Sequence, residues 1–111
     1  MTNAEIDALE SLALRRAVSE AVGWEWRGAG YAVQRHEDGR LRCFRDFDDW
    51  NEVLAACEAA NAGYINIQRD GEPGEFGPCV IIGVGIHVGK ADGCDSEAVL
   101  RALLKALEAG K

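Results

Sequence analysis

The feature that most constrains this sequence is the run from Cys79 to Gly89, which reads Cys-Val-Ile-Ile-Gly-Val-Gly-Ile-His-Val-Gly. Every second residue is β-branched, whereas the residues between them include three glycines. Successive side chains of a strand point to opposite faces, so the pattern predicts one strand with a bulky apolar face and a nearly bare face. Glycine inside a strand is typical of close backbone approach, and we expect a helix to pack there; a ligand against the backbone is the alternative.

Length and charge limit the class of protein. A chain of 111 residues is long enough for one domain with an ordinary core, and we expect a single domain over residues 1–111. It carries 12 Lys and Arg against 19 Asp and Glu, a net charge of -7. Direct nucleic-acid binding needs a basic patch, so this balance argues against it. An acidic surface usually serves solubility, and less often it imitates nucleic acid for a basic partner.

The spacing of the cysteines and the length of the apolar segments indicate the cellular compartment of the protein. The four cysteines lie far apart, without the paired spacing of a zinc site: Cys43, Cys57, Cys79 and Cys94. The sequence has no apolar run long enough to span a membrane and no segment typical of a signal peptide. We therefore expect a cytoplasmic protein with reduced thiols, without membrane contact, metal or cofactor.

Three helices are predicted. Residues 2–22 have helical spacing of apolar side chains, with a capping box at Thr2 and Glu5 and a stop at Gly23, which predicts one helix of about five turns. A second helix begins at residue 46 or 47, and the last runs from residue 95 or 96 to 110. Three aspartates lie at the start of the second helix: Asp46, Asp48 and Asp49. Their negative charges suit the positive end of a helix. They could instead hold a divalent cation through their oxygens, but the role at the helix start already explains them.

The strands fall into two groups between these helices. Residues 24–27 and 31–35 lead into Asp38-Gly39, a type I′ hairpin signal that would place Val33 opposite Phe44 and Arg35 opposite Arg42. Residues 64–69 alternate cleanly, and a turn-rich loop at 70–78 leads into the glycine-containing strand. The order α-β-β-α-β-β-α predicts an α+β fold, a helix-sheet-helix sandwich with a mostly antiparallel sheet.

Several short motifs recur in a known order along the chain. They are Gly-Trp-Glu-Trp at 23–26, the hairpin after it, Phe-Asp-Asp-Trp-Asn-Glu-Val at 47–53, Gly-Tyr at 63–64, and a closing helix rich in Ala and Leu. This succession resembles the phage ABA sandwich domain family, small proteins of bacteriophages and prophages with helix, sheet and helix layers. The resemblance covers nearly the whole chain, although the loop at 70–78 is longer than the family's. It implies a sandwich fold and a phage setting, and it brings no catalytic residues.

Catalysis is not expected from the residues. A cysteine nucleophile needs a nearby base, and the only histidines are His36 and His87. On one strand, Cys79 and His87 would lie roughly 26 Å apart. The glycines at 83, 85 and 89 lie within the predicted strand and lack the spacing of a phosphate-binding loop. We expect a binding protein and not an enzyme.

The favoured function is that of an accessory protein that counters host defence. It would block a basic surface of a host immune effector, such as a CRISPR complex or a nuclease, in the host cytosol during infection or from a prophage. The contact set consists of acidic side chains and one exposed aromatic residue: Asp46, Asp48, Asp49, Glu52, Glu72, Glu75 and Phe76.

The alternative function is an oligomeric sponge that sequesters a small nucleotide immune signal. A base would stack on an aromatic ring and a phosphate would pair with an arginine. The residues for this function are aromatic or basic: Trp24, Trp26, Arg27, Arg35, Arg69 and His87. A third possibility is an assembly or virion-associated protein.

Overall fold

The computed structural model describes residues 1–28, 30–45, 50–69 and 77–111. Within these ranges the chain forms four helices and two three-stranded antiparallel sheets. This confirms the α+β class and the predicted alternation of helices and strand pairs. The elements are α1 (Asn3–Asp7), α2 (Ser11–Ala21), β1 (Glu25–Arg27), β2 (Tyr31–Arg35), β3 (Leu41–Phe44), α3 (Trp50–Ala59), β4 (Ala62–Gln68), β5 (Cys79–Val84), β6 (His87–Asp92) and α4 (Ser96–Ala109).

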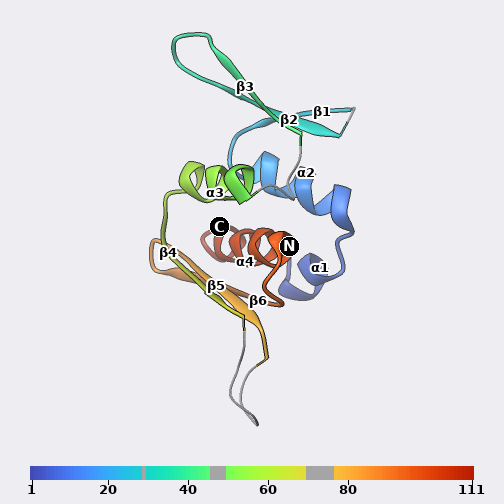
Figure 1. Cartoon of the computed structure of the whole chain (residues 1–111), viewed down its shortest axis with the longest axis vertical. Coiled ribbons are helices and arrows are strands. Elements are labelled where there is room, and N and C mark those ends of the chain that lie inside the picture. Colours follow the sequence, from blue (N-terminus) through green and yellow to red (C-terminus); the bar gives the residue numbers. More distant parts are fainter. Residues whose placement is uncertain (29, 46–49, 70–76) are drawn as a thin grey trace.

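The order of the layers differs from the expected sandwich. The molecule is elongated, with extents of 50 × 28 × 25 Å, and the two sheets lie at its ends with the helices between them (Figure 1). The N-terminal sheet has the order β1-β2-β3, and the C-terminal sheet has the order β4-β5-β6. The strand groups remain separate because each buries its apolar face against a different side of the helix layer. Helix α4 is central, and it contacts the other three helices as well as β5 and β6.

The predicted strand from Cys79 to Gly89 is wrong, because this run is a hairpin of two strands. Strand β5 ends at Val84, β6 begins at His87, and these two residues pair across a two-residue turn. The first turn residue, Gly85, has φ +62°, which suits a hairpin turn that begins with glycine. The turn reverses the alternation: Ile82 is fully buried, whereas Val88 is 62% exposed.

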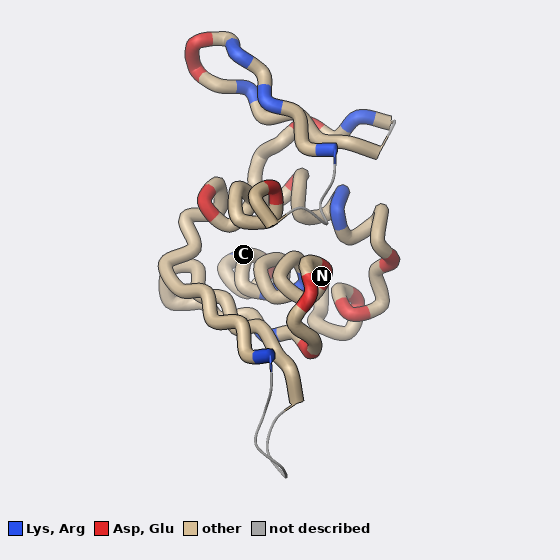
Figure 2. Tube along the Cα trace, viewed as in Figure 1, with Lys and Arg blue, Asp and Glu red and all other residues tan. Residues whose placement is uncertain are grey.

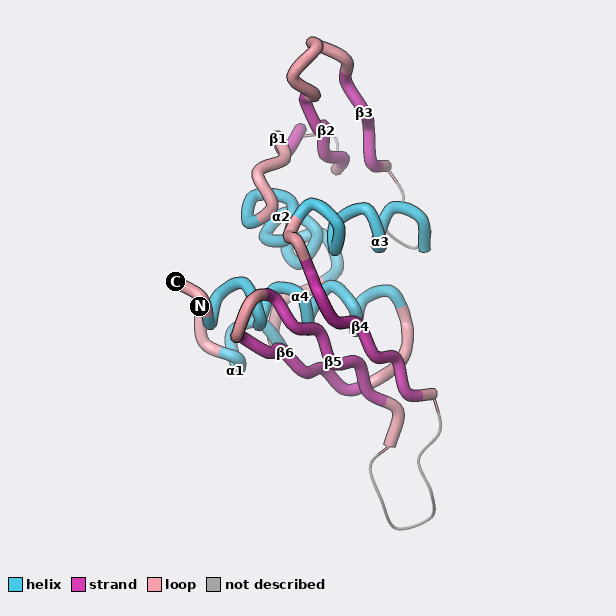
Figure 3. The backbone as a smooth tube through the Cα atoms, turned by 90° about the vertical axis from the view of Figure 1, so that its left-hand side faces the viewer, coloured by secondary structure: helices cyan, strands magenta, loops and turns pink. Residues whose placement is uncertain are grey.

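The helix expected over the glycines is confirmed at Gly89. Helix α4 crosses β6 there, and a Cβ on Gly89 would overlap the carbonyl oxygen of Ala102 and lie 2.6 Å from the backbone nitrogen of Ala106. Gly83 lies on the opposite face of the sheet, where its neighbour is the side chain of Tyr64. Among the described residues, the helices lie on one face of the C-terminal sheet (Figure 3), and Tyr64 and Gly83 lie on the other face.

The single N-terminal helix that we predicted is interrupted between Asp7 and Ser11. The capping box at its start is confirmed, since the Glu5 amide donates to Thr2 Oγ1 at 3.2 Å and the Thr2 amide donates to Glu5 Oε1 at 3.1 Å. The break turns the chain so that both short helices bury apolar side chains. A helix break leaves backbone carbonyls without a partner inside the helix. Helix α4 satisfies one carbonyl at this break, because Nη2 of Arg101 donates to the carbonyl of Leu9 at 3.2 Å.

The hairpin at Asp38-Gly39 forms with a register one residue away from the prediction. Phe44 lies opposite Ala32 rather than Val33, because the loop has three residues, 37–39, closed by the His36 amide donating to the Arg40 carbonyl at 2.9 Å. Only Gly39 in this loop has a positive φ, +87°, whereas a type I′ turn requires two such residues. The shift places Phe44 on the inner face of the sheet, where it is fully buried.

Candidate functional site

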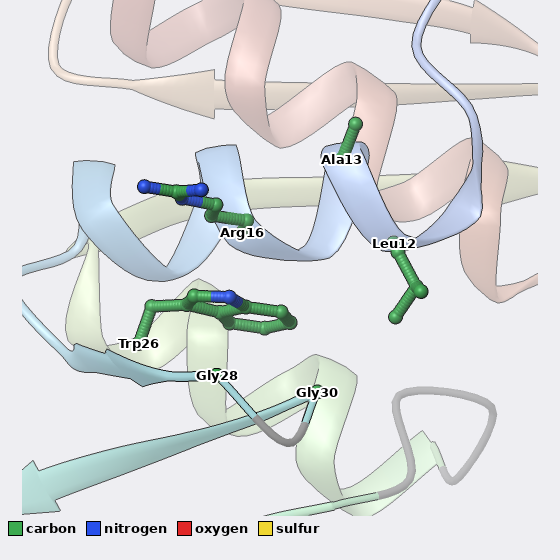
Figure 4. Close-up of a pocket in the computed structure, with 6 residues that line it drawn as sticks. All are labelled: Leu12, Ala13, Arg16, Trp26, Gly28 and Gly30. Carbon is green, nitrogen blue, oxygen red and sulfur yellow. The ribbon is translucent and has the colours of Figure 1, made fainter.

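A cleft of about 500 Å³ lies between α2 and the turn that joins β1 to β2 (Figure 4). Helix α2 provides one wall, and β1 with the following turn provides the other. The aromatic ring of Trp26 lies along the cleft and faces the helix. The lining residues are Leu12, Ala13, Arg16, Trp26, Gly28 and Gly30.

The alternation of β1 and the composition of the turn create this cleft. Trp26 pairs with Ala32 on the inner face of the N-terminal sheet, so its ring points toward the helices and is half-buried. Gly28 and Gly30 lie in the turn without side chains that could fill the space. A Cβ at Gly30 would already lie 3.6 Å from Cδ2 of Leu12. Two glycines beside a large ring therefore keep the cleft open.

Arg16 is the cation of the cleft lining. It lies on α2, and its Nε donates to Oε1 of Glu20 at 3.0 Å. Both side chains of this pair are more than half exposed, so the ion pair contributes little to stability. The guanidinium can therefore turn from Glu20 to an anion in the cleft at small cost, and the cleft combines an aromatic surface with one positive charge.

Trp24 is placed differently from Trp26. Its side chain is only 5% exposed, and its ring stacks on Phe44 with ring centroids 3.9 Å apart and an interplanar angle of 4°. This stack belongs to the core that joins the N-terminal sheet to the helices. The two tryptophans of the Gly-Trp-Glu-Trp motif therefore serve different purposes, and Trp26 alone borders the cleft.

Arg27 and Arg35 lie together on the outer face of the N-terminal sheet. Glu25 joins them, with Oε2 2.7 Å from Nη2 of Arg27 and Oε1 3.3 Å from Nη2 of Arg35. Since neighbouring residues of a strand point to opposite faces, these arginines lie on the opposite side of the sheet from Trp26. A single small ligand in the cleft would not reach both.

The remaining residues of this predicted set belong to the C-terminal sheet. Arg69 follows β4 and is exposed, and His87 opens β6. The imidazole of His87 lies at the end of α4, since a Cβ on Gly110 would be 3.2 Å from its Cδ2. The aromatic and basic residues predicted as one site are thus divided between the two ends of the molecule.

The acidic contact set falls largely outside the described residues. Asp46, Asp48, Asp49, Glu72, Glu75 and Phe76 belong to the segments 46–49 and 70–76. Glu52 is described, and it lies half-buried in the first turn of α3. Its Oε1 accepts a hydrogen bond from the Arg45 amide at 3.2 Å. Glu52 therefore links the residue after β3 to α3 by a hydrogen bond, which is a structural role.

The charges are unevenly distributed along the chain. Residues 25–45 carry five arginines and three acidic residues, whereas the rest of the sequence carries seven cations and sixteen acidic residues. Figure 2 shows several of these arginines along the N-terminal sheet and its projecting hairpin, and acidic residues on the helices. The strong negative charge of the protein therefore belongs to the part outside the N-terminal sheet.

Sequence reasoning missed the contribution of α2 to the cleft. The apolar spacing of residues 2–22 did not show which side chains are buried: Leu12 is 59% exposed, whereas the buried residues of α2 include Leu14 and Val18. The available signal was the spacing of Leu12 and Arg16, which places them one turn apart on a helix face away from Leu14 and Val18.

Comparisons with protein-family models, with curated proteins and with solved structures found no match. The resemblance to the phage ABA sandwich family therefore stays a prediction. None of the helices in the described ranges is long and apolar enough to cross a membrane. Within the same ranges, no three or more His, Cys, Asp or Glu residues lie together in a group that could hold a metal ion.

Proposed function

We propose that this protein acts by binding, as a small accessory protein of phage type that counters host defence. Its proposed action is to sequester a small nucleotide signal in the cleft between α2 and β1. The observation that carries this proposal is that Trp26 and Arg16 border the same cleft. Stacking of a base on an aromatic ring and pairing of a phosphate with a guanidinium are the two interactions that a nucleotide needs.

The size and lining of the cleft support a small ligand. Pockets for small molecules have volumes of about 300–1,000 Å³ and are mostly apolar with few polar groups. The cleft falls within this range, and the side chains that line it are apolar except for the guanidinium of Arg16 and the indole N–H of Trp26. The host cytosol and the phage setting come from the sequence resemblance and remain part of the proposal.

The test is calorimetric titration of the protein with mononucleotides and cyclic dinucleotides. Arg16→Gln removes the charge from an exposed side chain and should weaken binding without harming the fold. It should also reduce the dependence of affinity on salt, because an ionic contact is screened by salt. Trp26→Ala should abolish binding, and far-UV circular dichroism shows whether that variant has folded.

The matched control is Leu41→Ala, which removes an apolar side chain that is 54% exposed on β3 and outside the cleft lining. This variant should bind as the unchanged protein does. The proposal fails if no nucleotide binds, or if Arg16→Gln and folded Trp26→Ala retain full affinity.

The second candidate is the inhibitor that blocks a basic surface of an immune effector. It is favoured by the excess of sixteen acidic residues over seven cations outside residues 25–45. Replacement of Asp46, Asp48 and Asp49 by lysine reverses their charge. This variant should bind such an effector more weakly, and its affinity should depend less on salt concentration. Unchanged inhibition by that variant would exclude this candidate, and Trp26→Ala should have no effect on it.

A further inference from the structure

The outer edge of β4 is open. In the described chain β4 pairs with β5 alone, so alternate backbone amides and carbonyls along its other side face away from the sheet. Its residues are unusually accessible, with Tyr64 53% and Ile65 38% exposed and Asn66 exposed between the isoleucines. Figures 1 and 3 both place β4 at the margin of the molecule. An open strand edge is a template for another strand.

The hydrophobic layer of the sheet also remains incomplete at β4. Ile65 lies directly opposite Ile82 and shares its face, yet Ile82 is fully buried and Ile65 is not. The difference arises because α4 packs on β5 and β6 and contacts β4 far less, and because β5 has a strand on each side whereas β4 has one. One more strand beyond β4 would bury Ile65 as well.

The opposite edge of the same sheet is protected. Lys105 of α4 donates from Nζ to the carbonyl of Lys90 on β6 at 2.8 Å, and the same Nζ lies 2.8 Å from Oδ1 of Asp7 in α1. Lys105, paired with Asp7, therefore occupies the outer edge of β6 at Lys90, and this position is no longer free for another strand. Proteins commonly block edges with lysine. The two edges of this sheet therefore differ: a lysine side chain covers the edge of β6, and among the described residues none is seen to cover the edge of β4 in this way.

The sequence of β4 determines which partner fits. Residues 59–68 contain no charged side chain, although the chain as a whole carries a net charge of -7. Two copies of an acidic protein repel one another over most of their surfaces, and this segment is where they could meet without opposing like charges. Antiparallel pairing of a strand with itself also brings Ile65 of one copy opposite Ile67 of the other.

We propose that a second copy of this chain pairs antiparallel along β4, with Asn66 opposite its own counterpart and Tyr64 opposite Gln68. This register uses the regular part of the strand and avoids the irregularity between Ala62 and Tyr64. The two C-terminal sheets join into one sheet of six strands, and Ile65 is covered. The dimer is independent of the nucleotide cleft, which lies against the other sheet.

The first test is the mass of the protein in solution, by light scattering after size exclusion and by sedimentation. The unchanged protein should have twice the mass of one chain. Asn66→Lys places two lysines opposite each other across the symmetry axis and should give a monomer. The matched control is Asn51→Lys, the same replacement at an exposed position of α3, and it should remain a dimer.

The second test fixes the register by cross-linking in a Cys43→Ser background, which removes the exposed native thiol. Under oxidation Asn66→Cys should form a covalent dimer. Tyr64→Cys should not, because its two copies would lie about 13 Å apart, beyond the reach of a disulfide. Its partner across β5 is Gly83, so no thiol of the same chain lies opposite it. A monomeric unchanged protein, a dimeric Asn66→Lys variant, or equal cross-linking at 64 and 66 would each overturn the proposal.

Discussion

Gly89 of β6 and Ala102 of α4 touch backbone to backbone, so closely that a Cβ on the glycine would overlap the alanine carbonyl oxygen. This contact sets the distance between the C-terminal sheet and the central helix. It also explains why the sequence places a glycine inside β6.

Replacement of Gly89 by alanine should therefore destabilise the protein. Overpacking of this kind costs about 1–3 kcal/mol, and here the obstacle is backbone, which cannot rotate away. Chemical denaturation measures the loss. Gly63→Ala is the control, because a Cβ at Gly63 meets nothing within 4 Å; equal stability of the two variants would contradict the packing described above.

The turn at Gly39 predicts a difference between two substitutions. Gly39 has φ +87° and open space around its Cβ position, so the backbone conformation and not crowding limits the side chain. Gly39→Ala should lower the free energy of unfolding by about 1 kcal/mol, whereas Gly39→Asn should lose less because asparagine tolerates the left-handed region. Equal thermal stability of the two variants would argue against a loop with Gly39 in that conformation.

Lys105 should matter more for stability than its partner Asp7. The lysine side chain is 9% exposed and the aspartate 57%. Lys105→Met leaves the Lys90 carbonyl without this donor and should cost about 1–3 kcal/mol, whereas Asp7→Asn should cost less than about 1 kcal/mol because water replaces the lost contact. Denaturant titration of both variants decides this, and a larger loss in Asp7→Asn would be inconsistent with the geometry.

The thiols should differ in reactivity. Burial raises the pKa of the Cys57 thiol from 9.0 to about 11, whereas Cys43 is exposed. The folded state therefore favours the neutral thiol of Cys57. The stabilisation of the folded state by the neutral thiol is fully present below pH 9.0, and it is lost as pH rises through about 11. Iodoacetamide at pH 8 should modify Cys43 and spare Cys57, as read by peptide mass spectrometry. Comparable labelling of both thiols in the folded protein would refute the burial.

Local signals in the sequence were sufficient for several features of this fold. The Thr2 and Glu5 capping box formed as predicted, and Asp95 caps α4 by accepting from the Ala98 amide at 2.9 Å. These features depend on residues three positions apart, and distant packing does not alter them. The α+β class followed because the apolar spacing differs between the helices and the strands.

Features that depend on distant contacts could not be read in this way. The alternation from Val80 to Val88 suits one long strand, and the turn at Gly85 was missed because glycine serves equally in a strand under a helix and in a hairpin turn. The cleft arises where α2 packs beside Trp26, so no short segment encodes it. The separation of the sheets depends on which side of the helix layer each group of strands covers.

The most direct test of the proposed function is native mass spectrometry of the protein after incubation with nucleotides extracted from bacterial cells. The account predicts that the unchanged protein gains the mass of one nucleotide per chain. A smaller fraction of Arg16→Gln chains should carry a nucleotide, and no chain of folded Trp26→Ala should carry one. An unchanged mass would contradict it, and so would a nucleotide retained equally by all three proteins.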